Sequence, residues 1–352
     1  MEGFGSWSVL TADFLIVLYI ALNGVTLAAI LHLVNGKWRE QVRFLSVSTF
    51  ALMPVAFVLL IILLLNPEST FQWMSPSFGG GHGGHADAAH HLNGWHNYTF
   101  LVIRQITAFL VMATLYGLFI KYQHLATVDK SYAVQRKFRN IALLIPFGYV
   151  LYATMMAWDF EMTMMPNWHS ASYGAYHFVS NFHFFIAFMI IFLFILRKSG
   201  ALTKEIPDYV MNFLAQIMLA FTIIWTYLFF TQYLIMWYGR LPEEIVRFRN
   251  MMDNGLGVVW FTFVALKFVI PLSSLIFAFT RHTPAAMVVV ATGIVIGTWL
   301  ERYTWISGSV DPEFYHRPMT AGFDVVVTAI VGVVVIMALR WSLRKYGLVR
   351  SS

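Results

Sequence analysis

Residues 221–245 read FTIIWTYLFFTQYLIMWYGRLPEEI, and this stretch decides the fold class. Its first part is too apolar for a soluble core, and it has the length that a helix needs to cross a bilayer. Gln232 and the aromatic residues Tyr233, Trp237 and Tyr238 follow near its end, and such aromatic residues are typical of a membrane–water interface. The stretch then breaks at a glycine into charged residues, so it predicts a membrane-spanning helix and marks where the membrane ends.

The composition of the whole chain agrees with this interpretation. Of its 352 residues, 59% are hydrophobic and 11% are charged, whereas about 25% of the residues of a soluble globular protein are charged. The formal net charge of +6 does not indicate nucleic-acid binding, because the basic residues lie in short loops between apolar segments. We therefore predict an all-α polytopic membrane protein with a lipid environment and no nucleic acid as partner.

The absence of cysteine limits the redox chemistry that the chain can carry. It excludes cysteine-held iron–sulfur clusters, covalently attached c-type haem, disulfides and a thiol nucleophile. A redox centre would be carried by a partner, be held by histidine, or be a dissolved carrier such as a quinone. His177 and His183 are six residues apart and point to different helix faces, so the sequence does not favour a bis-histidine haem.

Nine segments are long and apolar enough to cross a bilayer, which takes about 20 residues each. We predict one integral membrane domain, 1–352, with no separate soluble domain. The N-terminus lacks the basic region of a cleavable signal peptide, so we expect the first apolar segment to remain as a spanning helix. The predicted helices are 8–34, 44–65, 99–121, 139–158, 171–196, 209–238, 255–279, 285–306 and 320–343.

Loop charges predict the orientation of these helices. Basic residues gather in alternate loops, whereas the other loops are acidic or mixed, so the positive-inside rule places the N-terminus outside and the C-terminus in the cytoplasm. The basic set is Lys37, Arg39, Arg43, Lys121, Lys130, Arg136, Lys137, Arg139, Arg197, Lys198, Lys204, Arg281, Arg344, Lys345 and Arg350.

The longest loop, 66–98, is rich in glycine and histidine. Imidazole binds zinc, copper or nickel, but the glycines argue against a preformed metal site, so we favour a flexible, solvated outer loop and assign no metal. Its histidines are His82, His85, His90, His91 and His96.

A second outer segment, 242–252, reads PEEIVRFRNMM. Its proline and acidic first turn predict a short helix, and Glu243 can pair with Arg247 one turn later. Ile245, Phe248 and Met252 share one face. We therefore expect this helix to lie on the outer surface of the membrane.

Polar side chains gather in the outer half of the predicted bundle. Ionisable groups are costly inside a bilayer, so each calls for a partner or a function. Lys267 lies near the midplane and is too deep to reach either surface easily. The other polar residues of this outer layer are Arg104, Asp159, Glu161, His177, Asn181, His183, Gln232, Glu301, Arg302 and Asp324.

This asymmetry suits a site where a hydrophobic carrier loses protons toward the outside. Quinol oxidation releases protons with electrons, and histidine and carboxylate groups accept protons near neutral pH. A blander interpretation is that these charged residues only reach the interface or pair with one another; it applies to Arg104, Asp159, Glu161, Arg302 and Asp324. We treat as quinone or proton-path candidates Arg104, Asp159, His177, Asn181, His183, Gln232, Lys267, Glu301, Arg302 and Asp324.

Four stretches resemble motifs of one membrane-protein family. Residues 159–170, DFEMTMMPNWHS, resemble D-W-x-M-S-L-x-P-x-W-x-S, and residues 232–244, QYLIMWYGRLPEE, resemble Q-Y-x-L-I-W-Y-G-N-[IL]-P-E-E. Residues 97–104, NYTFLVIR, are similar to N-x-x-F-F-x-x-R, and residues 314–324 resemble the final F-H…D motif. The chain thus resembles the NrfD-like membrane subunits of the ActF type, from alternative complex III, a quinol:electron-acceptor oxidoreductase.

The resemblance implies a subunit of the bacterial inner membrane with two four-helix bundles, one extra helix and no bound redox metal. Quinone or menaquinone is the candidate carrier. The implied partners are a second NrfD-like membrane subunit, a periplasmic iron–sulfur protein and c-type cytochrome subunits. The residues that match the motifs are Arg104, Asp159, Pro166, Trp168, Ser170, Gln232, Glu243, Glu244 and Asp324; of these, Trp168, Ser170, Glu243 and Glu244 are expected to face the partner.

Other interpretations stay open beside this one. Phe160 stands where the family has tryptophan and Arg240 where it has asparagine, so a related hydrogenase or molybdenum-enzyme complex is an alternative assembly. A structural membrane anchor is an alternative role. A transporter is least favoured, because the sequence shows no inverted repeat or paired broken helices.

Overall fold

The computed structural model describes residues 3–74, 94–166, 168–239, 242–252, 255–310 and 314–350, apart from the side chains of residues 242 and 243. Within these ranges nine helical segments are long and apolar enough to cross a membrane. The same ranges contain no β-strand beyond an isolated bridge between Leu202 and Val349. The predicted all-α, polytopic fold is confirmed.

Six of the spans are single helices: α1 (Phe4–Leu33), α5 (Tyr98–Val128), α6 (Tyr132–Phe160), α7 (Tyr173–Lys198), α8 (Asp208–Gly239) and α13 (Pro284–Ser307). A seventh, α14 (Gly322–Lys345), ends the chain. Two spans are interrupted: α2 (Arg39–Ser48) and α3 (Met53–Leu65) join through the 3₁₀ turn η1 (Thr49–Leu52), and α10 (Gly257–Val264) and α11 (Ile270–Leu275) join through the π-helix η5 (Ala265–Val269). The short elements are α4 (Pro67–Thr70), η2 (Gln72–Met74), η4 (Met162–Met164), α9 (Pro242–Met252) and α12 (Ala278–His282).

Several predicted boundaries were wrong because apolar composition marks the membrane core and not the full helix. Helical hydrogen bonding continues through polar residues, so α5 extends to Val128, α6 begins at Tyr132 and the second span begins at Arg39. The predicted helix 255–279 is wrong at its end, because the backbone of Phe277 is extended and separates α11 from α12.

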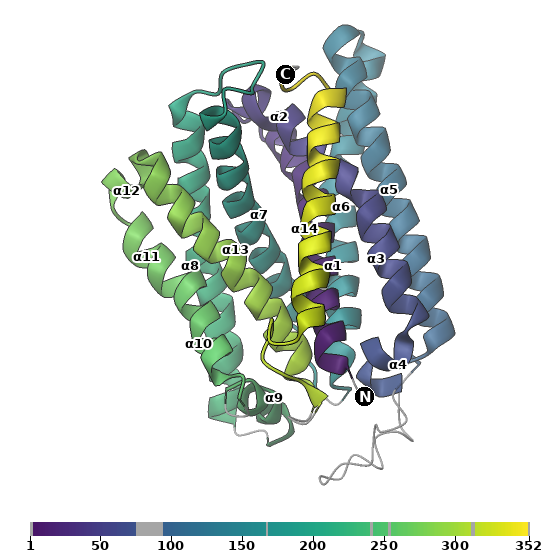
Figure 1. Ribbon diagram of the computed structural model, residues 1–352. Helices are drawn as coiled ribbons and strands as arrows, with labels where there is room; N and C mark the ends of the chain where they lie inside the picture. The colour runs from purple at the N-terminus through teal and green to yellow at the C-terminus, as the bar shows by residue number, and fades with distance from the viewer. Residues whose placement is uncertain are drawn as a thin grey trace.

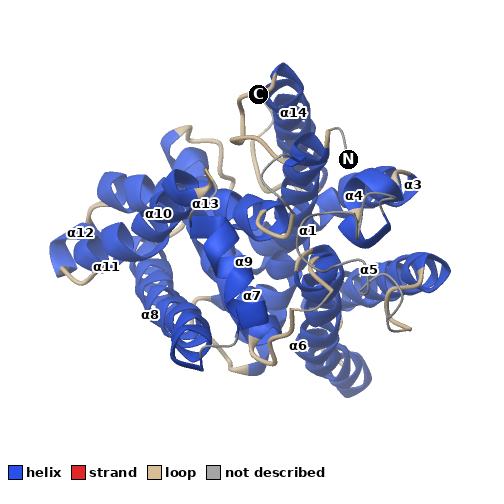
Figure 2. Ribbon diagram, turned by 90° about the horizontal axis from the view of Figure 1, so that it is seen from below, coloured by secondary structure: helices blue, strands red, loops and turns tan. Residues whose placement is uncertain are grey.

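Eight of the spans form two four-helix groups, and α1, a member of the first group, lies at the centre of the bundle (Figures 1 and 2). In the first group, α1 packs against α2–α3 and α6, and α6 packs against α5. In the second, α7 packs against α8 and α13, and α10–α11 closes the group against α8 and α13. The groups meet where α1 contacts α7 and α13 and where α6 contacts α7, and α14 packs on the outside of α1. The predicted arrangement of two bundles and one extra helix is confirmed.

The two ends of the bundle differ in the elements that they carry. The N-terminus, α4 and α9 lie at one end, here called the N-terminal face, and the C-terminus, α2 and α12 lie at the other, the C-terminal face (Figure 1). The basic loops after α1, α5, α7 and α11 all open on the C-terminal face.

A close approach holds α1 against the second span. A Cβ atom on Gly24 would lie 2.0 Å from Thr49 Oγ1 and 2.2 Å from the backbone oxygen of Ser46, and Ser46 Oγ donates to the Gly24 carbonyl at 2.6 Å. Only glycine fits here without moving the backbone.

Gly24→Ala is therefore expected to destabilise the fold by roughly 1–3 kcal/mol, the usual cost of overpacking a filled core. The melting temperature of the purified protein in mild detergent measures this effect. Gly332→Ala is the matched control, because a Cβ atom on that α14 glycine meets no atom within 4 Å. Equal melting temperatures for the two variants would contradict the expected close packing.

The helix predicted over 242–252 is present as α9, but its position corrects the prediction. Arg247, Phe248 and Met251 are buried, so α9 packs into the bundle through a face different from the expected one. Arg247 donates to the carbonyls of Met162 at 3.0 Å and Glu161 at 2.5 Å. The predicted Glu243–Arg247 pair cannot be placed, since the Glu243 side chain lies outside the described residues.

The reason for the burial of Arg247 is the end of α6. The chain turns there within the protein, and buried carbonyls at a helix end need donors. Arg247 also donates to the Trp305 carbonyl at 2.8 Å and lies 4.6 Å over the Trp168 ring. Burial lowers the pKa of Arg247 to about 10, so the guanidinium is still charged at neutral pH.

Candidate functional site

A cluster of buried ionisable side chains lies where the two helix groups meet. Its members are Glu161, His177, Lys267, Glu301 and Arg302, called here the central ion cluster, and none has exposed surface. They come from the end of α6, from α7, from the π-helix η5 and from α13. Four separate elements thus place charge in one apolar interior, where every charge needs a partner.

Two adjacent residues of α13 link the charges. Arg302 Nη1 donates to both carboxylate oxygens of Glu161, at 2.6 and 2.8 Å. Arg302 Nη2 lies 3.1 Å from Glu301 Oε2 and donates to Ser180 Oγ at 2.8 Å. Arg302 therefore bridges two carboxylates that are 140 residues apart in sequence.

Lys267 neutralises the second carboxylate. Its ammonium forms an ion pair with Glu301, donates to Ser180 Oγ at 2.7 Å and lies 4.7 Å from the centre of the Trp225 ring. Glu301 also accepts hydrogen bonds from Tyr176 OH, from Ser180 Oγ at 2.6 Å and from Trp225 Nε1 at 2.9 Å. With His177 neutral, the two carboxylates and the two cations of the central ion cluster have a net charge of zero.

The π-helix explains how Lys267 reaches the cluster. Pro271 has no N–H to donate to the carbonyl four residues earlier, which is that of Lys267, and its ring crowds that carbonyl. The helix relieves this by widening over Ala265–Val269, a distortion that is frequent at functional sites. Opposite it, a Cβ atom on Gly297 would lie 2.8 Å from Lys267 Cγ, so glycine provides the room.

His177 extends the cluster into the first helix group. Its Nδ1 lies 2.9 Å from Glu161 Oε2 and 2.5 Å from Arg302 Nη1, and its Nε2 lies 2.7 Å from Tyr19 OH on α1. Tyr173 OH donates to Glu161 as well. An unbroken series of polar contacts therefore runs Lys267–Glu301–Arg302–Glu161–His177–Tyr19, from one helix group to the other.

A second ion pair lies closer to the N-terminal face. Arg104 binds Asp159 through two hydrogen bonds, Nε to Oδ2 at 2.9 Å and Nη2 to Oδ1 at 2.6 Å. Gln105 Nε2 and Trp95 Nε1 donate to the same carboxylate at 2.5 and 2.7 Å. Such bidentate pairs fix geometry as well as charge, so this pair secures α5 to α6.

Two further carboxylates secure α14 to the bundle. Asp324 accepts from Ser6 Oγ at 2.8 Å and lies 2.7 Å from His316 Nε2. Asp13 accepts from Trp299 Nε1 and from Thr328 Oγ1, both at 2.7 Å. These two sites are separate from the central ion cluster.

The structure brings together only part of the predicted candidate set. His177, Lys267, Glu301 and Arg302 lie in the central ion cluster, whereas Arg104 pairs with Asp159 outside it. The remaining candidates lie apart: His183 contacts Thr222 at 3.0 Å, the Asn181 carbonyl accepts from Asn23, and the side chain of Gln232 is buried with no hydrogen-bond partner among the described residues.

The residues expected to face a partner have different surroundings. Trp168 is buried beneath Arg247 and next to Trp305, so within this chain its ring faces the interior. Ser170 is half-buried with its hydroxyl 3.2 Å from Ser172 Oγ, and Glu244 is half-buried. The side chain of Glu243 lies outside the described residues.

Sequence reasoning missed several residues that complete the site. Glu161 was placed in the polar layer but not among the candidates, although it joins Arg302 to His177. Tyr19 and Ser180 carried no signal, because single hydroxyl residues are common in membrane helices. Asp13 was missed despite its clear signal, an acidic residue inside an apolar span.

A cavity of about 220 Å³ lies at the N-terminal face, and its wall includes Trp95, which donates to Asp159. Its wall includes Trp168, whose indole Nε1 is buried without a hydrogen-bond partner among the described residues. Burial lowers the pKa of His96, another wall residue, which favours the neutral imidazole. The lining residues are Trp95, His96, Trp158, Met162, Thr163, Pro166, Trp168 and His169.

The described residues contain no group of three or more histidine, aspartate or glutamate side chains that could hold a metal ion. The glycine–histidine segment, with His82, His85, His90 and His91, lies outside the described part of the chain. No protein-family model matches the chain, and no curated protein matches it either. The function is therefore inferred from the geometry of the chain itself.

Proposed function

We propose that this chain is a proton-conducting membrane subunit of a quinol-oxidising electron-transfer complex. The observation that carries the proposal is the unbroken series of buried contacts from Lys267 to Tyr19. Lysine, glutamate, histidine and tyrosine can each hold or release a proton, whereas the guanidinium of Arg302 keeps its protons and holds the two carboxylates together. Ionisable residues within a membrane bundle often mark proton relays. A purely apolar contact between the two helix groups would avoid the cost of burying four charges.

The direction of proton movement follows from the loop charges. The C-terminal face carries the basic loops, and the positive-inside rule assigns such a face to the cytoplasm. In this orientation the N-terminal face, with the cavity beside Trp168, is outside. The protons of a quinol oxidised near that cavity would then be exchanged with the outer side or with the central ion cluster.

The redox metal centres of the complex belong to partners in this proposal. The chain has no cysteine to hold iron–sulfur clusters or c-type haem. The sequence resemblance to ActF-type NrfD-like subunits suggests a periplasmic iron–sulfur protein, c-type cytochromes and a second NrfD-like subunit in a bacterial inner membrane. Such a partner would bind at the matched motif residues Ser170, in the loop before α7, and Glu244, in α9.

The identity of the proteins that copurify with the chain in mild detergent tests this assignment. An iron–sulfur protein with multihaem cytochromes supports it. A nickel–iron or molybdenum partner moves the chain to a related quinone-reactive complex, and purification of the chain alone contradicts the proposed assembly.

The cavity beside Trp168 is the proposed contact for a quinone or menaquinone headgroup. A quinone carbonyl is a hydrogen-bond acceptor, and the unpartnered Nε1 of Trp168 is a donor in an aromatic wall. Trp168→Phe keeps the ring and removes the donor. We expect it to raise the KM for quinol by roughly three- to tenfold, the usual effect of one lost hydrogen bond.

Steady-state quinol oxidation by the assembled complex measures this change. Trp260→Phe is the matched control, since Trp260 Nε1 is also without a partner among the described residues but does not line the cavity. A KM unchanged in both variants would remove the quinone contact from this cavity without affecting the proton-conduction proposal.

A structural anchor is the second candidate function. It is favoured by the completeness of the pairing, because every carboxylate of the central ion cluster has a cationic partner. Such a cluster would join the two helix groups and specify their packing. The two functions differ in one respect: only proton conduction requires titratable groups at these positions, as opposed to merely polar ones.

A further inference from the structure

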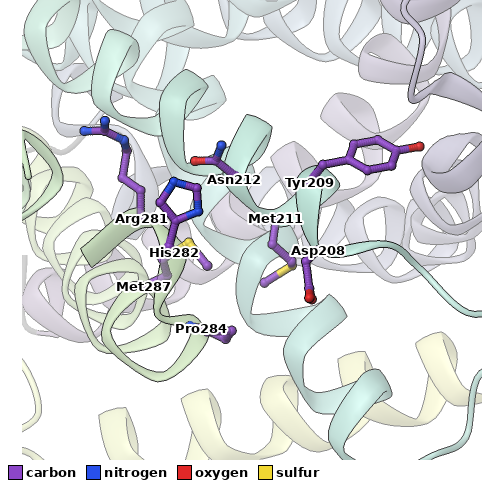
Figure 3. Close-up of a pocket in the computed structure, with 8 residues that line it drawn as sticks. All are labelled: Asp208, Tyr209, Met211, Asn212, Arg281, His282, Pro284 and Met287. Carbon is purple, nitrogen blue, oxygen red and sulfur yellow. The ribbon is translucent and has the colours of Figure 1, made fainter. Parts of the chain in front are cut away.

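A pocket with several polar side chains in its wall opens on the C-terminal face, far from the central ion cluster in the fold. It lies between the first turns of α8, the short helix α12 and the start of α13, and its volume is about 360 Å³ (Figure 3). The residues that line it are Asp208, Tyr209, Met211, Asn212, Arg281, His282, Pro284 and Met287. Neither the proposed proton path nor the cavity beside Trp168 uses any of them.

The pocket contains polar atoms that the protein leaves without partners. Arg281 Nη1 donates to the carbonyls of Leu275 and Ile276 and so closes the end of α11. Its Nε is buried without a partner among the described residues, and so is Asn212 Oδ1. The pocket thus offers an unused guanidinium donor and an unused amide acceptor, which an occupant would satisfy.

The charge of the pocket favours an anionic group. The Arg281 guanidinium is a cationic hydrogen-bond donor, and the His282 imidazole is a second donor. The carboxylate of Asp208 is already paired with Arg197 at 2.6 Å. In Figure 3 the side chains of Asn212 and His282 approach the same part of the pocket, and the Tyr209 ring points away from it. A guanidinium with an imidazole beside it suits a phosphate.

The surroundings of the pocket favour a lipid over a soluble phosphate. Beside Arg281, the side chains of Ile276, Phe277 and Phe279 are 59%, 56% and 71% exposed. They belong to the end of a membrane span, so this apolar surface meets acyl chains. An amphiphile could place its headgroup in the pocket and its chains along this surface, as basic pockets between membrane helices do.

We propose that this pocket binds the headgroup of an anionic phospholipid, with phosphatidylglycerol as its representative. The phosphate lies against Arg281 and His282, and a glycerol hydroxyl donates to Asn212 Oδ1. Phosphatidylcholine offers the same phosphate, but it carries no hydroxyl or N–H donor and has no net charge. The proposal requires only that the chain lies in a membrane, and it does not depend on the proposed proton conduction.

Lipid add-back to the delipidated full-length protein tests the proposal, with the shift in melting temperature and native mass spectrometry as readouts. Phosphatidylglycerol is expected to raise the melting temperature saturably, because a ligand that binds the native state stabilises it. Phosphatidylcholine is expected to bind at least roughly fivefold more weakly, because it lacks the hydrogen-bond donor. An equal response to inorganic phosphate at the same concentration would overturn the assignment to a lipid.

Two variants locate the binding site. Arg281→Gln is expected to weaken phosphatidylglycerol binding by roughly tenfold, the effect of losing a hydrogen bond to a charged group. Since Arg281 also closes α11, Asn212→Leu provides the second test: Asn212 Oδ1 has no hydrogen-bond partner among the described residues, and its loss is expected to weaken binding by about threefold. Arg340→Gln, on the exposed surface of α14, is the control. Binding to Asn212→Leu and Arg281→Gln as tight as to Arg340→Gln would overturn the proposal.

Discussion

Lys267→Met is expected to destabilise the folded chain by roughly 3–5 kcal/mol, the cost of removing one partner from a buried ion pair. The reason is that the central ion cluster then keeps two carboxylates and one guanidinium in an apolar interior. The free energy of unfolding in mixed micelles measures the effect. The double variant Lys267→Met/Glu301→Gln removes both charges and is expected to recover most of the loss.

The difference in the free energy of unfolding between the single and the double variant separates the effect of charge from that of packing. Recovery in the double variant would show that Lys267 and Glu301 are both ionised in the folded protein and stabilise one another. A single variant as stable as the original chain would contradict an ionised pair. A double variant that is no more stable than the single one would indicate that packing, and not charge, explains the loss.

His177→Gln is expected to slow proton transfer through the central ion cluster by about 100-fold, the lower end of the contribution of a general acid or base, so that proton release per quinol oxidised falls. His177 is the contact between Glu161 and Tyr19, and a glutamine can keep hydrogen bonds there but cannot carry a proton. Proton release per quinol oxidised, followed with a pH-sensitive dye in proteoliposomes, measures this change.

His183→Gln is the matched control for this substitution. His183 is equally buried and lies on the same helix, but its ring is within hydrogen-bond distance of Thr222, and among the described residues it makes no hydrogen bond to the series from Lys267 to Tyr19. It is expected to change proton release by less than about twofold, as a side chain that takes no part in proton transfer. Equal losses in the two variants would indicate a general disturbance of α7 and would contradict the specific role of His177.

The features of the fold that could be predicted from the sequence are those set by local composition. The length of an apolar segment identified each of the nine spans in the described residues, and loop charge sorted the loops onto two faces. The break in the seventh span also had a local signal, because Pro271 lies four residues after Lys267. Proline at that spacing disturbs the carbonyl of Lys267, and the π-helix is the outcome.

The composition of the site was less predictable because it depends on pairings between distant elements. Glu161 and Arg302 are remote in sequence, and no local pattern indicates that the end of α6 meets α13. Arg247 shows the same limit: its helix has the pattern of a surface helix, yet its guanidinium is buried among carbonyls that the sequence does not reveal as unsatisfied. The sequence shows which span carries each charge, whereas it does not show which partner that charge meets.

Proton release and quinol turnover, measured together for Lys267→Met/Glu301→Gln in the assembled complex in proteoliposomes, test the central claim most directly. This variant keeps the charge balance of the cluster and is expected to fold, as thermal unfolding of the same preparation verifies. Proton conduction through the cluster predicts that quinol oxidation continues while proton release per quinol falls. Unchanged proton release at unchanged turnover would contradict it and leave the central ion cluster with a structural role.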